Sequence, residues 1–169
     1  HLHSQARGKL GWDEQQLCFK PTTVHEASFN AGAGNGVFAT DKAIENGMQA
    51  GTAAARAAGF DIADGSAPEV AAPAQSWRPL AAWKVTNGMG EGEGPKAFVD
   101  YQNDVTASDV KLAVREGYQS VEHVKRYTTL GMATDQGKTS NINGLAILAE
   151  SLGNEIPRVG TTTFRMPYT

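Results

Sequence analysis

A stretch rich in proline, glycine and alanine, residues 61–95, divides this 169-residue chain into two parts. It holds four prolines and five glycines, which interrupt both helices and strands. Such a composition suits a linker or a loosely packed strap rather than the middle of one hydrophobic core. The sequence therefore predicts two small units, and we place the linker between them at residues 63–95.

Three apolar stripes at helical spacing follow this linker. Thr106 precedes an acidic residue three positions on, Asp109, which is the pattern of a capping box at a helix start, and the first stripe ends at Gly117. The second runs from Ser120 to near Gly131, and the third from Ser140 to Gly153. Glycine is the commonest residue just after a helix. We therefore expect three short helices joined by tight loops, and an extended chain after them.

Ahead of the linker, the glycine cluster of residues 32–36 leads into a run of helix formers. We predict a helix from Val37 to Ala58, ended by Gly59, and brief strands at residues 17–19 and 27–29. Backbone N–H groups at such a helix start can hold a phosphate. The spacing Gly-x-Gly-x-Gly differs from the dinucleotide fingerprint, so a tight turn without a ligand stays open. One helix face consists of small residues: Ala39, Ala43, Gly47, Ala50, Gly51, Ala54 and Ala58.

Composition excludes several classes of function. The net charge is -3 and the 15 basic residues are scattered, which argues against a nucleic-acid or anionic membrane surface. No apolar run approaches the roughly 18 residues that span a bilayer, so a cytoplasmic protein is expected. Cys18 is the single cysteine, and we interpret it as a buried, inert thiol. The sequence shows no catalytic nucleophile with a matching general base, and the histidines lack metal-ligand spacing. We therefore predict no catalytic residue and no metal site.

The glycine cluster carries a first resemblance. Residues 29–38, with Gly47 and Gly51 after them, resemble the closing segment of flavoprotein reductases that have two dinucleotide-binding domains. In those proteins a Gly-Asp pair near this turn approaches the cofactor. Gly34-Asn35 stands at that place here, so the acidic contact is missing. The small-residue face is the packing that dinucleotide-binding helices use against their sheet.

The run from Phe98 to Ser140 carries a second resemblance, to the bacterioferritin-associated ferredoxin-like domain, which holds a 2Fe-2S cluster with four cysteines. The corresponding positions here are Asp100, Gln102, Asp135 and Ser140. None is a thiol, and iron–sulfur clusters depend on thiolate ligands. We therefore expect the scaffold without an iron–sulfur cluster.

The loop that would have held this cluster is rich in cations, hydroxyl groups and glycines, which together suit a phosphate. Its cations are Lys125, Arg126 and Lys138, and its hydroxyl groups belong to Thr128, Thr129, Thr139 and Ser140. The alternative is a solvated basic helix end, where Lys and Arg offset the helix dipole.

Residues 96–106 and 124–141, and residues 4–14 near the start, resemble the alpha subunit of heterotetrameric sarcosine oxidase. The resemblance implies the middle of a longer subunit, in a complex with beta, gamma and delta subunits that oxidises sarcosine at FAD. Electrons would pass to FMN and then to oxygen, tetrahydrofolate would capture the methylene group, and the alpha subunit would hold NAD. The implied NAD contacts are Gly32, Ala33, Phe38 and Thr40. The implied FMN phosphate contacts are Lys125, Arg126, Thr128, Thr129, Lys138 and Thr139.

The predicted fold class is α+β and mostly helical: a partial dinucleotide-binding segment at 1–62, the linker, a ferredoxin-like helical domain at 96–153, and an extended connection to a folate-binding domain at 154–169. Two alternatives remain open. The chain could come from the alpha subunit of a related opine, hydroxyproline or proline dehydrogenase, although those often keep cysteines in the helical domain. In isolation it could be a non-catalytic interaction module, because half a dinucleotide-binding domain exposes apolar surface.

Overall fold

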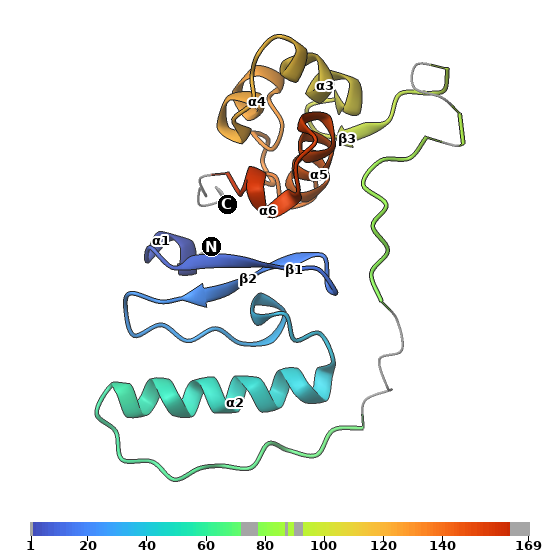
Figure 1. The fold of residues 1–169 in the computed structure, drawn as a ribbon. Helices are drawn as coiled ribbons and strands as arrows, with labels where there is room; N and C mark the ends of the chain where they lie inside the picture. Colours follow the sequence, from blue (N-terminus) through green and yellow to red (C-terminus); the bar gives the residue numbers. More distant parts are fainter. Residues whose placement is uncertain (1, 72–77, 87, 90–92, 163–169) are drawn as a thin grey trace. The chain divides into compact units, whose positions relative to one another are not determined.

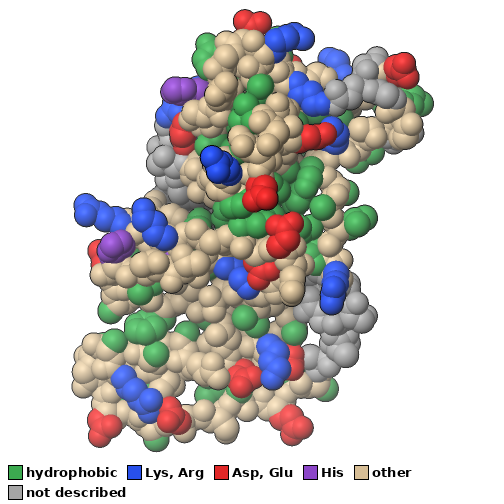
Figure 2. Space-filling view, in the orientation of Figure 1, with side chains coloured by type: hydrophobic (Ala, Val, Ile, Leu, Met, Phe, Trp, Pro, Cys, Tyr) green, Lys and Arg blue, Asp and Glu red, His purple; other side chains and the backbone are tan. Residues whose placement is uncertain are grey.

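The structure is a computed structural model that describes residues 2–71, 78–86, 88–89 and 93–162. Contacts within the chain separate two compact units, with the division between Leu80 and Ala81. Figure 1 shows the element order, and each unit is described by itself. Over the face shown in Figure 2, cationic and acidic side chains are scattered among one another rather than gathered into a field of one sign.

A β-hairpin organises the start of the first unit. After the short helix α1 (Leu2–Gln5), strand β1 (Lys9–Asp13) pairs antiparallel with β2 (Cys18–Thr23). Trp12 lies opposite Phe19, and their rings meet edge to face with centroids 5.0 Å apart. Such cross-strand aromatic pairs stabilise isolated ribbons. The strand expected at residues 27–29 is wrong, because Ser28 N–H bonds back to the carbonyl of Glu26 (2.7 Å) in a tight turn.

The glycine cluster forms a separate turn before the long helix. It is a 3-10 helix, η1 (Gly32–Asn35), closed by hydrogen bonds from Gly36 N–H and Val37 N–H to the carbonyls of Ala33 and Gly32, both 3.0 Å. Because Gly36 is left-handed (φ 77°), the chain leaves this turn extended. Helix α2 (Thr40–Ala57) therefore starts three residues later than predicted.

The chain turns back after α2 (Figure 1). Gly59 adopts a left-handed conformation (φ 91°), as a helix stop requires. Arg56 then donates to the carbonyl of Ile62 and pairs with Asp64, both at 3.0 Å, which holds the returning chain beside the helix end. None of the residues of α2 is buried, although many are half-buried, so the described first unit leaves this helix without a fully covered face.

The second unit contains a three-helix core. A two-stranded antiparallel ribbon, β3 (Phe98–Asp100) and β4 (Val105–Thr106), leads directly into α3 (Ala107–Arg115), followed by α4 (Val121–Thr128) and α5 (Asn141–Leu152). The three predicted helices are confirmed. Thr106 and Asp109 form the expected reciprocal capping box, which satisfies two of the N–H groups at the start of α3.

Apolar stripes from all three helices meet in this core. Val110, Val124, Ile147 and Leu148 are at most 1% exposed, and α3 packs against both α4 and α5. Burying each such side chain contributes about 1.5–3 kcal/mol. Helix α5 ends at left-handed Gly153 as predicted. The extended chain predicted after it is wrong in part, since residues Ile156–Val159 form a further short helix, α6, with proline in its first turn.

The end of the predicted linker belongs to the helical unit. Lys84 Nζ pairs with both carboxylate oxygens of Glu150 on α5, at 2.8 and 2.9 Å. The described strands form two antiparallel pairs and no parallel sheet. The chain is thus a mixed α/β structure dominated by helices, and its described elements alone do not establish a dinucleotide-binding or ferredoxin fold.

Candidate functional site

The turn between β3 and β4 lies against the loop between α4 and α5, and Asp100 joins them. Its side chain is 2% exposed. One carboxyl oxygen accepts from the N–H groups of Gln102 (3.0 Å) and Asn103 (3.2 Å) in its own turn. The other accepts from Gly131 N–H (2.7 Å) and approaches the hydroxyl of buried Ser140 (3.5 Å). Asp100 therefore connects residues 31 and 40 positions away in the sequence.

Asp135 makes similar hydrogen bonds within the loop between α4 and α5. Its carboxyl group accepts from Gly137 N–H (3.1 Å) and from both the N–H (3.1 Å) and the hydroxyl (2.6 Å) of Thr139. Its own N–H points to the side-chain oxygen of Gln102 at 3.5 Å. The structure thus brings together the four positions matched to cluster ligands, Asp100 with Ser140 and Gln102 with Asp135. Their oxygen atoms are engaged with one another and with the loop backbone.

Two glycines of the same loop are held close to Asn141. Gly131 and Gly137 are left-handed, with φ of 66° and 77°, and a Cβ on either would overlap the Asn141 side chain. The Asn141 side-chain oxygen is buried without a hydrogen-bond partner. The lack of a side chain at these two glycines therefore serves internal packing of the loop.

The residues predicted to hold the FMN phosphate differ in how they are engaged. Arg126 pairs with Glu122 one turn earlier (2.7 Å), and Lys125 is buried. The Thr128 hydroxyl donates to the carbonyl of Val124 (2.8 Å), and that of Thr129 to the carbonyl of Thr128 (2.6 Å). Thr139 is bound to Asp135, as described above. Arg126 and Lys138 are the two cations of this set with exposed side chains.

The hydrogen bonds to Asp135 give the loop a pH dependence. The Thr139 hydroxyl, followed by the N–H groups of Gly137 and Thr139, holds the pKa of Asp135 below its usual value. A lowered pKa means that the carboxylate stabilises the folded loop above about pH 4, and that this contribution is lost as pH falls through the folded pKa. We expect the amide resonances of Gly137 and Thr139 to shift with a midpoint below that of a free aspartate. Asp135→Asn should abolish the transition. A midpoint at or above pH 4 would contradict the assignment.

In the first unit, the glycines of the turn have different surroundings. Gly36 is left-handed, a conformation that favours glycine, and a Cβ there would also force the side chain of Lys20 to shift. Gly32 and Gly34 have nothing within 4 Å on that side, so an external group could approach their backbone. The turn is tied to α2 by Asn46, whose side-chain oxygen accepts from Gly32 N–H (3.1 Å).

The four predicted NAD contacts surround this open turn and the start of α2. Gly32 and Ala33 lie in η1, exposed Phe38 follows it, and Thr40 is the first residue of α2. Ala39 at the N-cap offers no side-chain hydrogen bond to the helix start. A shallow cavity of about 270 Å³ lies nearby, lined by Asn30, Asn35, Asn46 and both polar and apolar neighbours. None of the four predicted contacts lines it.

His3 has a structural role that the sequence did not reveal. It is 6% exposed, with Nε2 2.8 Å from the carbonyl of Lys9 and Nδ1 3.2 Å from the Asn30 amide nitrogen. Its ring therefore connects the hairpin to the segment before the glycine turn. The nearby repeat of histidines at the start of the chain gave no hint of this contact, which depends on a residue 27 positions away.

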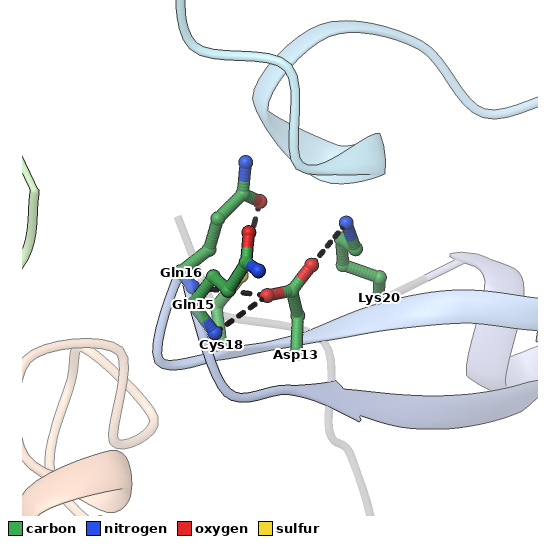
Figure 3. A network of polar contacts seen from close by, with 5 residues as sticks. All are labelled: Asp13, Gln15, Gln16, Cys18 and Lys20. Atoms are coloured by element: carbon green, nitrogen blue, oxygen red, sulfur yellow. Dashed lines mark hydrogen bonds and ion pairs between the residues drawn. The ribbon is translucent and has the colours of Figure 1, made fainter.

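Cys18, the first residue of β2, lies beside the polar hairpin turn shown in Figure 3. Asp13 accepts from the N–H groups of Gln15 and Gln16 (both 2.9 Å) and pairs with Lys20, whose ammonium lowers the pKa of that carboxyl group. Burial, and then Asp13, raise the pKa of the Cys18 thiol. The thiol is partly exposed rather than buried as predicted.

The described residues contain no group of three His, Cys, Asp or Glu side chains that could hold a metal ion. No helix among them is long and apolar enough to cross a bilayer.

The chain is similar to known proteins along its whole length. Residues 94–169 match the family described as the sarcosine oxidase A3 domain. The whole chain is 44% identical to sarcosine oxidase subunit alpha from Corynebacterium sp. strain P-1 and from strain U-96, and 38% identical to that from Rhizobium meliloti strain 1021. It spans 17–18% of the length of these relatives. The resemblance is therefore confirmed: all of the chain is homologous to part of the alpha subunit of sarcosine oxidase.

Proposed function

We propose that the chain works within the alpha subunit of a sarcosine oxidase complex, where it binds and positions cofactors rather than carrying out the chemistry. The observation that carries this proposal is the identity of 38–44% along the whole chain to subunits of that name. The complex would oxidise sarcosine to glycine, with tetrahydrofolate accepting the methylene group and oxygen reduced to peroxide. FAD and tetrahydrofolate would lie elsewhere in the complex, with the beta, gamma and delta subunits as partners.

The first unit would contribute to NAD binding through the turn at Gly32. Two observations support this assignment. The backbone of Gly32 and Gly34 is open to an approaching group, and α2, an 18-residue helix, begins without a side-chain cap. Uncapped N–H groups at a helix start favour an anion such as a pyrophosphate. Phe38 and Thr40 stand at the same helix start and would contact the remainder of the cofactor.

The α4–α5 loop would face the FMN phosphate from one side. Because Asp100 and Asp135 already accept from the N–H groups of Gly131, Gly137 and Thr139, the loop backbone offers few donors to a phosphate. The exposed cations Arg126 and Lys138 would therefore supply the main attraction. Such a half-site fits a cofactor shared with another subunit. When bound, FMN supplies the electron transfer to oxygen.

The test is FMN content in the complex assembled from full-length subunits. The double substitution Arg126→Ala with Lys138→Ala removes the two exposed cations. It should weaken FMN binding about tenfold or more, since each substitution removes a charge-assisted contact. FAD content should stay unchanged. The control pair is Arg115→Ala with Lys9→Ala, which removes the same charges elsewhere. Unchanged FMN affinity in the first pair would contradict the phosphate assignment.

A second role, as an interaction module without activity, is favoured for the chain on its own. Helix α2 has no buried residue in the described structure, although its small-residue face suits close packing against another element. The cofactor contacts proposed above would then be complete only in the assembled protein.

A further inference from the structure

The shallow cavity of the first unit contains none of the cofactor contacts proposed above. It has a volume of about 270 Å³ and is lined by residues from the end of β2, from the segment after it, from η1 and from α2. None of its nine lining residues carries a charge. A charged ligand would find no opposite charge in this wall to compensate for its loss of water. The ligand of such a cavity is therefore expected to be neutral.

Three half-buried asparagines supply the polar groups of this wall: Asn30, Asn35 and Asn46. Asn46 Oδ1 accepts from Gly32 N–H (3.1 Å). Because a backbone N–H can only donate, this contact fixes the orientation of the Asn46 amide and leaves its Nδ2 group as a donor. Asn35 Nδ2 lies 3.5 Å from the same oxygen, which leaves Asn35 Oδ1 as an acceptor. Neither of these two groups bonds to another residue in the described part of the chain.

A donor and an acceptor on neighbouring amides match a ligand that carries both on one edge. A primary carboxamide has such an edge, and so does adenine, to which asparagine side chains form paired hydrogen bonds. The cavity wall also has apolar surface, since Phe29 is 44% exposed and lines the cavity together with Val24. A flat aromatic ring can pack against a phenylalanine side chain. The wall therefore combines amide recognition with a surface for a ring.

We propose that this cavity binds a neutral planar ring with an amide or amidine edge, the chemistry that nicotinamide and adenine share. Its volume is below the roughly 300–1,000 Å³ of sites that enclose whole ligands, so it takes one ring rather than a complete dinucleotide. The proposal rests on the cavity alone and does not depend on a pyrophosphate at the Gly32 turn. It is therefore tested with rings that carry no phosphate.

Amide chemical shifts of the 169-residue chain, including the side-chain NH2 groups of asparagine, test the proposal. Nicotinamide and adenosine are titrated in parallel. Nicotinate is the matched control, because it keeps the ring and replaces the carboxamide by a carboxylate. We expect saturable shifts at Asn35 and Asn46 in the millimolar range, with nicotinate about tenfold weaker than nicotinamide. Tighter binding of nicotinamide identifies a carboxamide site, and tighter binding of adenosine identifies an adenine site. No saturable shift with either ring, or equal affinity for nicotinate and nicotinamide, would overturn the proposal.

Two variants test the amide groups themselves. Asn46→Asp removes only the donor, because its carboxylate still accepts from Gly32 N–H, and it should weaken binding of the preferred ring about tenfold. Asn154→Asp adds the same charge in the helical unit and should leave the affinity unchanged. Asn35→Ala removes the acceptor and should also weaken binding. Its side chain makes a single long contact (3.5 Å) within the described structure, so the turn should fold without it, and the dispersion of the backbone amide resonances checks this for each variant. Unchanged affinity in both cavity variants would exclude these amides as the binding groups.

Discussion

Asp100→Ala is expected to lower the free energy of unfolding of the helical unit by about 3 kcal/mol or more. The Asp100 carboxyl group is 2% exposed and accepts hydrogen bonds from three backbone N–H groups, with a further hydroxyl at 3.5 Å. Its removal leaves the buried N–H of Gly131 without a partner, which alone costs about 1–3 kcal/mol. It also opens a cavity beside Ser140. Urea unfolding followed by circular dichroism measures the change.

A matched pair of substitutions shows whether the acceptor oxygens are responsible. Asp100→Asn keeps the side-chain volume. Its amide N–H groups must, however, point toward some of the backbone N–H groups that now donate to the carboxylate, and two donors cannot bond to each other. Asp104→Asn makes the same chemical change at an exposed position of the same turn, where the left-handed backbone (φ 54°) tolerates asparagine. We expect clear destabilisation in the first and little in the second. Faster amide exchange at Gly131 in Asp100→Asn would locate the effect, and equal stability of both variants would refute it.

The helical unit could be predicted from sequence because its signals are local. Thr106 and Asp109 are three residues apart, and the stripe that ends at Gly153 repeats within a single helix. Each helix is therefore specified by residues that contact one another along a few turns. The ribbon of β3 and β4 was missed because it is only three and two residues long. No alternation of side chains can be recognised over such a length.

The positions of the polar residues at the α4–α5 loop could be predicted from sequence, but their hydrogen bonds could not. The resemblance to a ferredoxin selected Asp100, Gln102, Asp135 and Ser140, and the structure brings these residues together in pairs. What the sequence could not show is that Asp100 and Asp135 bind the loop backbone. Those contacts depend on how the turn after β3 meets a loop 31 residues away, and a single sequence contains no record of such a distance.

The linker shows a different limit of prediction from sequence. Its composition indicated an irregular chain, and the described residues between 63 and 95 form no helix or strand. Composition alone does not show which surface such a chain contacts. The bidentate pair between Lys84 and Glu150 attaches part of it to α5 across 66 residues. A segment predicted to be a linker is therefore attached at Lys84 to the helical unit.

Substituting two exposed glycines of α2 should have opposite effects in the isolated chain and in the complete protein. In the 169-residue chain, a Cβ on Gly47 or Gly51 would meet nothing within 4 Å. Because glycine destabilises a helix interior by about 0.5–1 kcal/mol relative to alanine, Gly47→Ala with Gly51→Ala should stabilise α2 by about 1–2 kcal/mol. Amide exchange in this helix measures the gain.

In the full-length subunit the same double substitution should lower NAD content several-fold, if the small-residue face of α2 packs closely against a dinucleotide-binding sheet. A Cβ on either glycine would then separate the two surfaces and displace the turn at Gly32, which Asn46 ties to this helix. Gln49→Ala is the control, because at 100° per residue it lies on the opposite face of the same helix. Unchanged NAD content in the glycine variant would show that this face does not pack closely against the cofactor domain. Reduced content in Gln49→Ala as well would show that the loss does not come from the small-residue face.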